Sequence, residues 1–357
     1  MTDLRTTTPS QRAGIRVTPR MPPFQFEPAS FPEAWFDGDD GITAAWNALS
    51  VVAAAAEGEF MDAGRWLLDR IDDPDVAAET RAFIQQEASH SAVHGRFNEC
   101  LAQRGLPVTP LTTFSVDVFT AMEAYGGRSV QLSAGLAGEQ LIGEMGHVVL
   151  ARPESMQGAA EAPRALWMWH WYEEVEHQAA LHDGWVHVHG QSRDARAQRV
   201  LGAAYILVLL LAVWPVATWA MLPPARGAKP SRARSVSFRP LMRQLFGREG
   251  LLIPAFKNLT ALARVDFHPF QLHDPVPTLE RWRDQVTDPS WERKAPSAGR
   301  HGGLRSEIAP PRVGARDLLQ LVRFTGFAAT RALQFARAVR GQRASSASTA
   351  AGDARGA

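Results

Sequence analysis

Two segments of the sequence place a glutamate and a histidine three residues apart. Glu87 and His90 form one pair, and Glu174 and His177 form the other, with His170 one helical turn before Glu174. Residues three or four apart share one face of an α-helix, so each segment can direct a carboxylate and an imidazole toward one point. Oxygen and nitrogen donors of this kind suit a divalent metal ion. The spacing therefore predicts a metal site built on helices.

The second segment lies in a strongly apolar stretch. Ionisable groups in an apolar helix are costly unless they are paired or bound to a metal. We therefore expect its imidazoles and carboxylate to face the protein interior. The aromatic neighbours are expected to pack in the core or to wall a pocket; they are Trp167, Trp169, Trp171 and Tyr172.

The first expected helix should contribute a single glutamate. We predict Glu59 for this role, because Glu57 lies about 200° away around the helix and both cannot face inward. His94, four residues after His90, is expected to be a hydrogen-bonded core histidine; the alternatives are that it orients a ligand or binds metal directly. Glu173 and Glu176 flank the second segment and are expected to support the ligands or to lie on the surface.

The third expected helix should contribute another glutamate. Glu139 is the predicted ligand. Glu144 and His147 form a competing Glu-x-x-His pair, and Glu123 is a weaker alternative because it precedes a double glycine.

The resulting set has four carboxylates and three imidazoles, enough for two divalent ions with bridging carboxylates. Iron fits these donors best, with manganese or zinc as alternatives. No thiolate is placed for a structural zinc site, and no His-Glu-x-x-His, Gly-x-Ser-x-Gly or phosphate-binding loop occurs. The predicted ligands are Glu59, Glu87, His90, Glu139, His170, Glu174 and His177.

Four helical stretches must position these residues. They are expected over 43–70, 74–104, 110–151 with an interruption at Gly126-Gly127, and 163–190. No run of alternating β-branched residues competes with them. The predicted fold is all-α: a ferritin-like four-helix bundle with additional C-terminal helices.

The predicted organisation has four parts. Residues 1–30 are expected to form an extended arm, because prolines there oppose helix. Residues 31–198 form the metal-binding bundle, and 199–286 form an apolar helix and a helical extension. Residues 287–357 form an Arg-rich, partly disordered tail.

Two segments suggest contact with a membrane. Residues 200–222 carry no charged side chain and are long enough to span a bilayer or to form a buried core helix. Basic residues on both sides disfavour a simple single span. Residues 313–340 form a basic amphipathic pattern that suits an anionic membrane surface, or a helix that docks on a partner or is solvated.

Composition sets further bounds. The chain has 357 residues, 45% of them hydrophobic, and a formal net charge of +1, which indicates no nucleic-acid partner. A single cysteine, Cys100, fits a reducing compartment. The first 30 residues lack the apolar core of a secretory signal. We therefore predict a cytoplasmic protein, with membrane association as the alternative that the two segments above leave open.

At its candidate ligands the chain resembles the bacterial family of predicted metal-dependent hydrolases. The matching segments are 58–60, 83–94, 169–177 and the later 266–270, and the resemblance covers roughly residues 20–285. The ligand order is also similar to that of the di-iron N-oxygenase that oxidises p-aminobenzoate. The sequence Gln178-Ala179-Ala180 and the lack of a histidine after Glu139 depart from that pattern and leave the substrate and reaction open.

These resemblances imply an enzyme. An oxidoreductase with two irons would reduce oxygen, oxidise a small organic substrate and take electrons from a donor. A hydrolase would use metal-activated water. A third interpretation is a bundle that binds or stores metal without catalysis. The sequence leaves the oligomeric state open.

Overall fold

The computed structural model describes residues 8–223, 237–248, 250–293 and 312–356, and side chains as far as residue 345. These residues form helices joined by short connections, and their β-pairing is limited to two isolated bridges. The all-α class predicted from the sequence is therefore confirmed.

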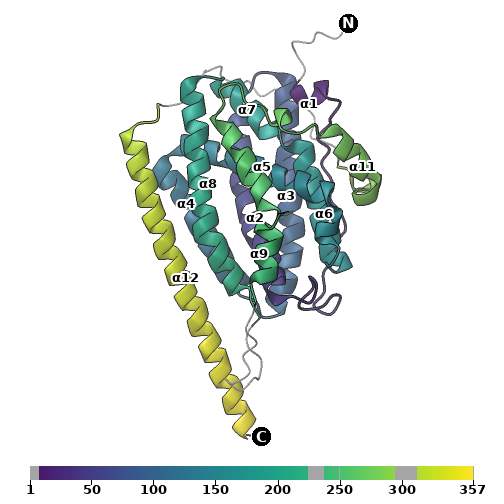
Figure 1. Cartoon of the computed structure of the whole chain (residues 1–357), viewed down its shortest axis with the longest axis vertical. Helices are drawn as coiled ribbons and strands as arrows, with labels where there is room; N and C mark the ends of the chain where they lie inside the picture. Colours follow the sequence, from purple (N-terminus) through teal and green to yellow (C-terminus); the bar gives the residue numbers. More distant parts are fainter. Residues whose placement is uncertain (1–7, 224–236, 249, 294–311, 357) are drawn as a thin grey trace.

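Four helices that pack together carry the candidate ligands (Figure 1). Helix α2 packs against α3 and α5, and α6 packs against the same two helices. The four helices therefore enclose a common interior, although their relation to ferritin-like bundles stays a prediction. Their bounds are α2 Asp40–Leu68, α3 Pro74–Gln103, α5 Arg128–Ala151 and α6 Glu161–His177.

Local sequence signals explain where these helices begin and end. The Asp39 carboxylate caps α2 by accepting from the Ile42 N–H. Asp73 caps α3 in the same way, and Pro74 fills its first turn, where a missing N–H is harmless. Gly127 has φ of 77° and separates α4 (Val108–Gly126) from α5, as expected from the double glycine.

The last predicted bundle helix is broken. The expected helix over 163–190 ends at His177, and α7 (Ala180–His189) follows after Gln178 and Ala179. The Gln178 side chain turns to His147 of α5, with 3.1 Å between Gln178 Oε1 and His147 Nε2. The chain thus changes direction immediately after the last candidate ligand.

Helix α8 (Arg193–Ala220) covers α2 and α5. Gly202 brings the two backbones close, since a Cβ at this position would lie 2.3 Å from the carbonyl carbon of Ser133. Within the described part of the chain, α8 is the one helix long and apolar enough to cross a membrane, and 44% of its most apolar window is buried. Both interpretations of this segment therefore stay open.

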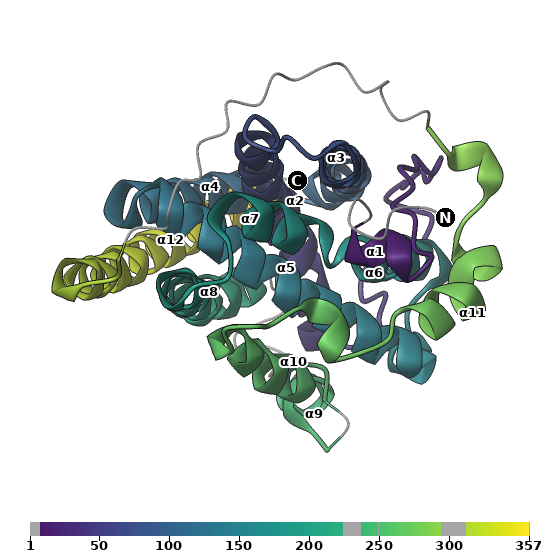
Figure 2. The ribbon, with the colours of Figure 1, turned by 90° about the horizontal axis from the view of Figure 1, so that it is seen from above.

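The C-terminal half adds short helices on one side of α5 and a long helix along α4 and α8 (Figure 2). The long helix, α12, continues to Gly356, into the tail that we expected to be partly disordered; its alanines are good helix formers. Residues 294–311 of that predicted tail lie outside the described residues. The elements are α9 Arg239–Phe246, α10 Leu252–Leu259, η3 Thr260–Ala263, η4 Pro269–Gln271, α11 Val276–Val286, η5 Pro289–Trp291 and α12 Ala315–Gly356.

The N-terminal segment is an extended strap with one short helix, α1 (Pro9–Arg12). It runs over α3 and α6. The Thr18 N–H donates to Glu176, and the Thr18 carbonyl accepts from Gln86. Arg20, only 4% exposed, follows directly. The predicted arm is thus part of the wall of the bundle.

Candidate metal centre

Six of the predicted ligands lie together between α3, α5 and α6. Each is at most 2% exposed. Glu87 Oε1 is 3.1 Å from His177 Nε2 and 3.6 Å from His90 Nδ1. Donor atoms that share one ion at about 2.0–2.2 Å lie roughly 3–3.5 Å apart, so these separations suit coordination. The six residues are Glu87, His90, Glu139, His170, Glu174 and His177.

The structure corrects the choice of glutamate on the first helix. Glu57 is buried and its Oε1 lies 3.9 Å from His170 Nδ1, whereas Glu59 accepts from Gln131 away from the cluster. Only one of the two can face inward, and α2 is rotated so that Ser50 points to the interior. Glu57 lies seven residues, or two turns, after Ser50 and shares its face. The spacing links Glu57 to Ser50, but only the rotation of α2 in the structure identifies this face as the inner one.

The competing candidates of the third helix lie elsewhere. Glu144 accepts from Asn258 and lies 2.9 Å from His273 Nε2, while His147 contacts Gln178. Glu123, at the C-terminal end of α4, forms an ion pair with Arg128 of α5. Glu139 instead enters the cluster, with 3.4 Å between its Oε2 and His177 Nε2.

Glu174 lies at the middle of the cluster. Its Oε1 is 3.2 Å from His170 Nε2 and 3.4 Å from His90 Nδ1, and its Oε2 is 3.4 Å from His177 Nε2. The two oxygens of one carboxylate therefore face different imidazoles. Four groups of donors within the described residues could hold metal. Three of them overlap at this centre, Glu57–His90–His170, Glu87–His90–Glu174 and Glu87–Glu139–His177, and the fourth, His182–Asp183–His268, lies outside it.

Several of these buried donor atoms lack a hydrogen-bond partner in the described part of the chain. They include both oxygens of Glu87 and of Glu139, Nδ1 of His90 and Nε2 of His177. Buried polar atoms are almost always paired, because leaving them unpaired is costly. A metal ion among them would satisfy these atoms, so the residues fit a metal centre.

The orientation of His170 is fixed by a chain of hydrogen bonds. The Ser50 hydroxyl donates to Asn98, 2.8 Å away, so it accepts from His94 Nδ1. His94 Nε2 then accepts from His170 Nδ1 at 3.2 Å. Burial lowers the pKa of His94 to about 3, which keeps that ring neutral. His170 Nε2 is left with its lone pair toward Glu174. His94 thus orients a ligand, one of the roles expected for it.

His177 is held by a hydrogen bond in the same manner, and His90 lies beside a carboxylate. Gln86 donates to Glu176 and to a backbone carbonyl, so its oxygen accepts from His177 Nδ1 at 2.9 Å. His90 Nε2 lies 3.2 Å from Glu173 Oε2. Each ring therefore turns its other nitrogen to the cluster. Metal-binding histidines typically have their second nitrogen fixed by such a partner.

Arg20 joins these supporting carboxylates. Its guanidinium lies 3.0 Å from Glu173 and contacts both oxygens of Glu176 at 3.0 Å. Burial opposes the charge, but the two carboxylates raise the pKa of Arg20, so it stays protonated. Sequence analysis placed Glu173 and Glu176 beside the ligands and missed Arg20, which lies in the N-terminal strap.

The pKa values of the glutamates reflect their burial close to one another. Burial raises the pKa of Glu57 to about 8 and that of Glu139 to about 7, and it raises the pKa of Glu87 well above its ordinary value. Burial acts the same way on Glu174, but His177 and His170 hold its pKa well below the ordinary value. Without added positive charge, the carboxylates compete for protons.

The later motif 266–270 has a structural place outside this centre. His268 Nδ1 accepts from the Phe270 N–H at the start of η4, and its Nε2 lies 3.1 Å from Asp183 Oδ1. His182 lies beside the same carboxylate. The motif thereby fastens the loop before η4 to α7.

The fold and the centre define an all-α protein with buried clusters of glutamate and histidine that could hold metal ions. A model of the family described as predicted metal-dependent hydrolase matches residues 18–273, and the chain belongs to that family. The resemblance to this family that the sequence indicated is thereby confirmed. No curated protein and no solved structure matches the chain.

Proposed function

We propose that the chain is an enzyme whose centre holds two divalent ions. The observation that carries this proposal is the common orientation of three imidazoles: His170 and His177 are each held from outside by a hydrogen bond, and His90 Nε2 lies 3.2 Å from Glu173 Oε2. Glu139 with His177 would form one end, and Glu57 with His90 and His170 the other. Glu87 and Glu174 lie between the ends and would bridge the ions.

For the reaction, we favour oxidation of a small organic substrate by dioxygen. Four carboxylates and three imidazoles suit iron, and four ionised carboxylates would balance the charge of two divalent ions. Bound iron would supply the electrons that reduce dioxygen, and turnover would draw on an electron donor. The chain itself surrounds the centre with apolar rings. Trp169 contacts the edge of the His90 ring, with 5.0 Å between centroids, and excludes water.

We further propose a route for the substrate beside the strap. A cavity of about 340 Å³ is lined by Arg20, Glu176, Tyr172 and Arg283. Arg20 and Glu176 thus contact the cavity on one side and the supports of the ligands on the other. The mixture of cationic and anionic walls suits a small polar molecule.

Hydrolysis is the second candidate, and family membership favours it. A metal ion can lower the pKa of a bound water and polarise an ester or amide carbonyl. The same donor set would serve, with zinc or manganese in place of iron.

The test is to load metal-free protein with iron(II) under anaerobic conditions and then to admit air. We expect rapid dioxygen uptake that Glu174→Ala abolishes and Glu144→Ala, altered outside the centre, leaves intact. Ester and amide probes offered to zinc- or manganese-loaded protein test the alternative. Probe cleavage without dioxygen uptake would favour hydrolysis. Metal binding with neither activity would refute both proposed reactions.

A further inference from the structure

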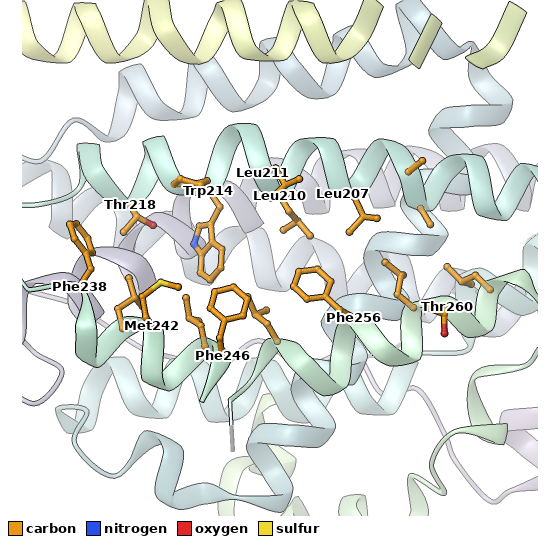
Figure 3. Close-up of a pocket in the computed structure, with 18 of the residues that line it drawn as sticks. Leu207, Leu210, Leu211, Trp214, Thr218, Phe238, Met242, Phe246, Phe256 and Thr260 are labelled. Atoms are coloured by element: carbon orange, nitrogen blue, oxygen red, sulfur yellow. The ribbon is translucent and has the colours of Figure 1, made fainter. Parts of the chain in front are cut away.

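A large apolar groove lies on the side of α8 that faces α9, α10 and η3. Its volume is about 1010 Å³. Leu207, Leu211 and Trp214 of α8 face Met242, Phe246 and Phe256 across it (Figure 3). Apart from two threonine hydroxyls and two indole N–H groups, its described lining side chains are apolar. The metal centre lies among other helices and contributes no residue to the lining.

Hydrogen bonds outside the groove hold both of its walls in place. Arg199, fully buried near the start of α8, donates to the carbonyls of Leu262 and Arg264 and fastens η3. In α9, Gln244 accepts from the Trp46 indole of α2. In α10, Asn258 donates to Glu144 of α5. Since both walls are fixed to the bundle by polar contacts, the groove cannot simply close on itself.

The groove leaves large apolar side chains in water. Leu211 is 78% exposed, Met242 50%, and Phe246 43%. A contiguous exposed apolar patch on a folded chain marks an interaction surface. A protein partner would need hydrogen-bonding groups at roughly one per 100–200 Å², and this lining offers few. The lining instead matches the chemistry of lipid acyl chains.

The chain segments that form the groove carry charges of a single sign, although Asp37 and Glu154 of other segments line a neighbouring pocket with the arginines of α9. Among the described residues between Val200 and Val265, every charged side chain is cationic. All five are exposed, and one of them, Arg264, lies 4.0 Å from Asp266, which follows this segment; the five are Arg239, Arg243, Arg248, Lys257 and Arg264. Glu249 lies outside the described residues. An apolar surface with a cationic border complements a bilayer that carries anionic headgroups.

We propose that the α8–α9–α10 groove docks the protein peripherally on an anionic lipid bilayer. The apolar side chains enter the acyl region and the arginines and lysine pair with headgroup phosphates. Trp214 lies within the groove and has an unpaired indole N–H in the described part of the chain, which suits the polar boundary of a bilayer. This inference is independent of the reaction at the metal centre.

The experiment uses the full-length, metal-loaded protein and vesicles of phosphatidylcholine with or without phosphatidylglycerol. We expect sedimentation with the anionic vesicles, release by high salt, and quenching of tryptophan fluorescence by brominated acyl chains. Trp214→Phe should reduce that quenching, and adding Trp219→Phe, the second indole of the lining, should remove most of it. Arg239→Gln with Arg243→Gln should weaken binding about 25-fold, at about fivefold per removed charge. Leu211→Asp should weaken it on the order of tenfold.

Matched controls lie outside the groove. Val116→Asp changes a half-exposed apolar residue of α4, and Arg164→Gln changes an exposed arginine of α6. Both should bind vesicles as the wild type does, and circular dichroism should show all variants folded. Equal binding to neutral and anionic vesicles, or undiminished binding by the groove variants, would overturn the proposal. So would a wild-type dimer that Leu211→Asp separates while vesicle binding is absent.

Discussion

Replacing Arg20 with alanine should destabilise the protein and weaken metal binding together. Arg20 contacts Glu173 and both oxygens of Glu176 at 3.0 Å, and these carboxylates are 0% and 4% exposed. Removing one partner of a buried ion pair leaves uncompensated charge and costs about 3–5 kcal/mol. At about 2 °C per kcal/mol for a chain of this size, the melting temperature should fall by roughly 6–10 °C.

The metal affinity should fall for a separate reason. Glu173 lies 3.2 Å from His90 Nε2, and Glu176 holds Gln86, whose oxygen accepts from His177. Losing partners of this kind typically lowers metal affinity about 10- to 100-fold. Urea unfolding of the metal-free protein and competitive metal titration measure the two effects separately.

The exposed Arg16 of the same strap provides the control, since Arg16→Ala should change neither quantity. Adding Glu173→Gln and Glu176→Gln to the Arg20 variant should restore much of the stability, because the unpaired charges are gone, without restoring the affinity. A stability loss below about 1 kcal/mol for Arg20→Ala would refute the reasoning, because a buried pair broken on one side must cost more.

Three further predictions follow from the centre and its packing. Glu57→Gln should lower the affinity for one ion at least about tenfold, and Glu59→Gln should leave it unchanged; equal losses in calorimetric titrations would contradict the assignment. Metal-free protein should lose thermal stability between pH 6.5 and 8, because the pKa values of Glu139, about 7, and Glu57, about 8, lie above the ordinary value near 4.5. In this window the folded state binds more protons than the unfolded state, so stability falls as pH rises. His90 and His177 add to the decline, because burial opposes their charge but the neighbouring glutamates raise the pKa of both rings well above the ordinary value. Saturating metal should abolish this decline, and a decline that persists with metal bound would point to groups outside the centre. Gly202→Ala should cost more than about 2 kcal/mol, since its Cβ would lie 2.3 Å from the backbone of α5, whereas Gly95→Ala, with open space around it, should stabilise the protein by about 0.5–1 kcal/mol. Chemical denaturation that ranks the two glycine variants equally would show that α5 and α8 are not packed this closely.

The features that the sequence could predict are those that depend on residues close together in the chain. Glu87 with His90, and Glu174 with His177, fix one another's direction because each pair shares a turn of helix. Asp73 and Pro74 mark the start of α3 by their own chemistry. These features depend only on neighbours in the chain.

Other features depend on distant parts of the fold. The choice between Glu57 and Glu59 follows from the rotation of α2 as a whole, which contacts with α3 determine. The break after His177 depends on a side chain of α5. The role of Arg20 could not be predicted either, because its partners lie 153 and 156 residues further along the chain.

That separation has a consequence for how the protein matures. Residue 20 leaves the ribosome long before residues 173 and 176, so the strap must wait until α6 has been synthesised before it can dock. Until then, the imidazoles of His90 and His177 lack the contacts that aim them. Under the proposed function, metal uptake with full affinity would therefore be a late event in biogenesis, after the polypeptide has been completed through α6, and a nascent chain would bind metal less firmly than the folded protein.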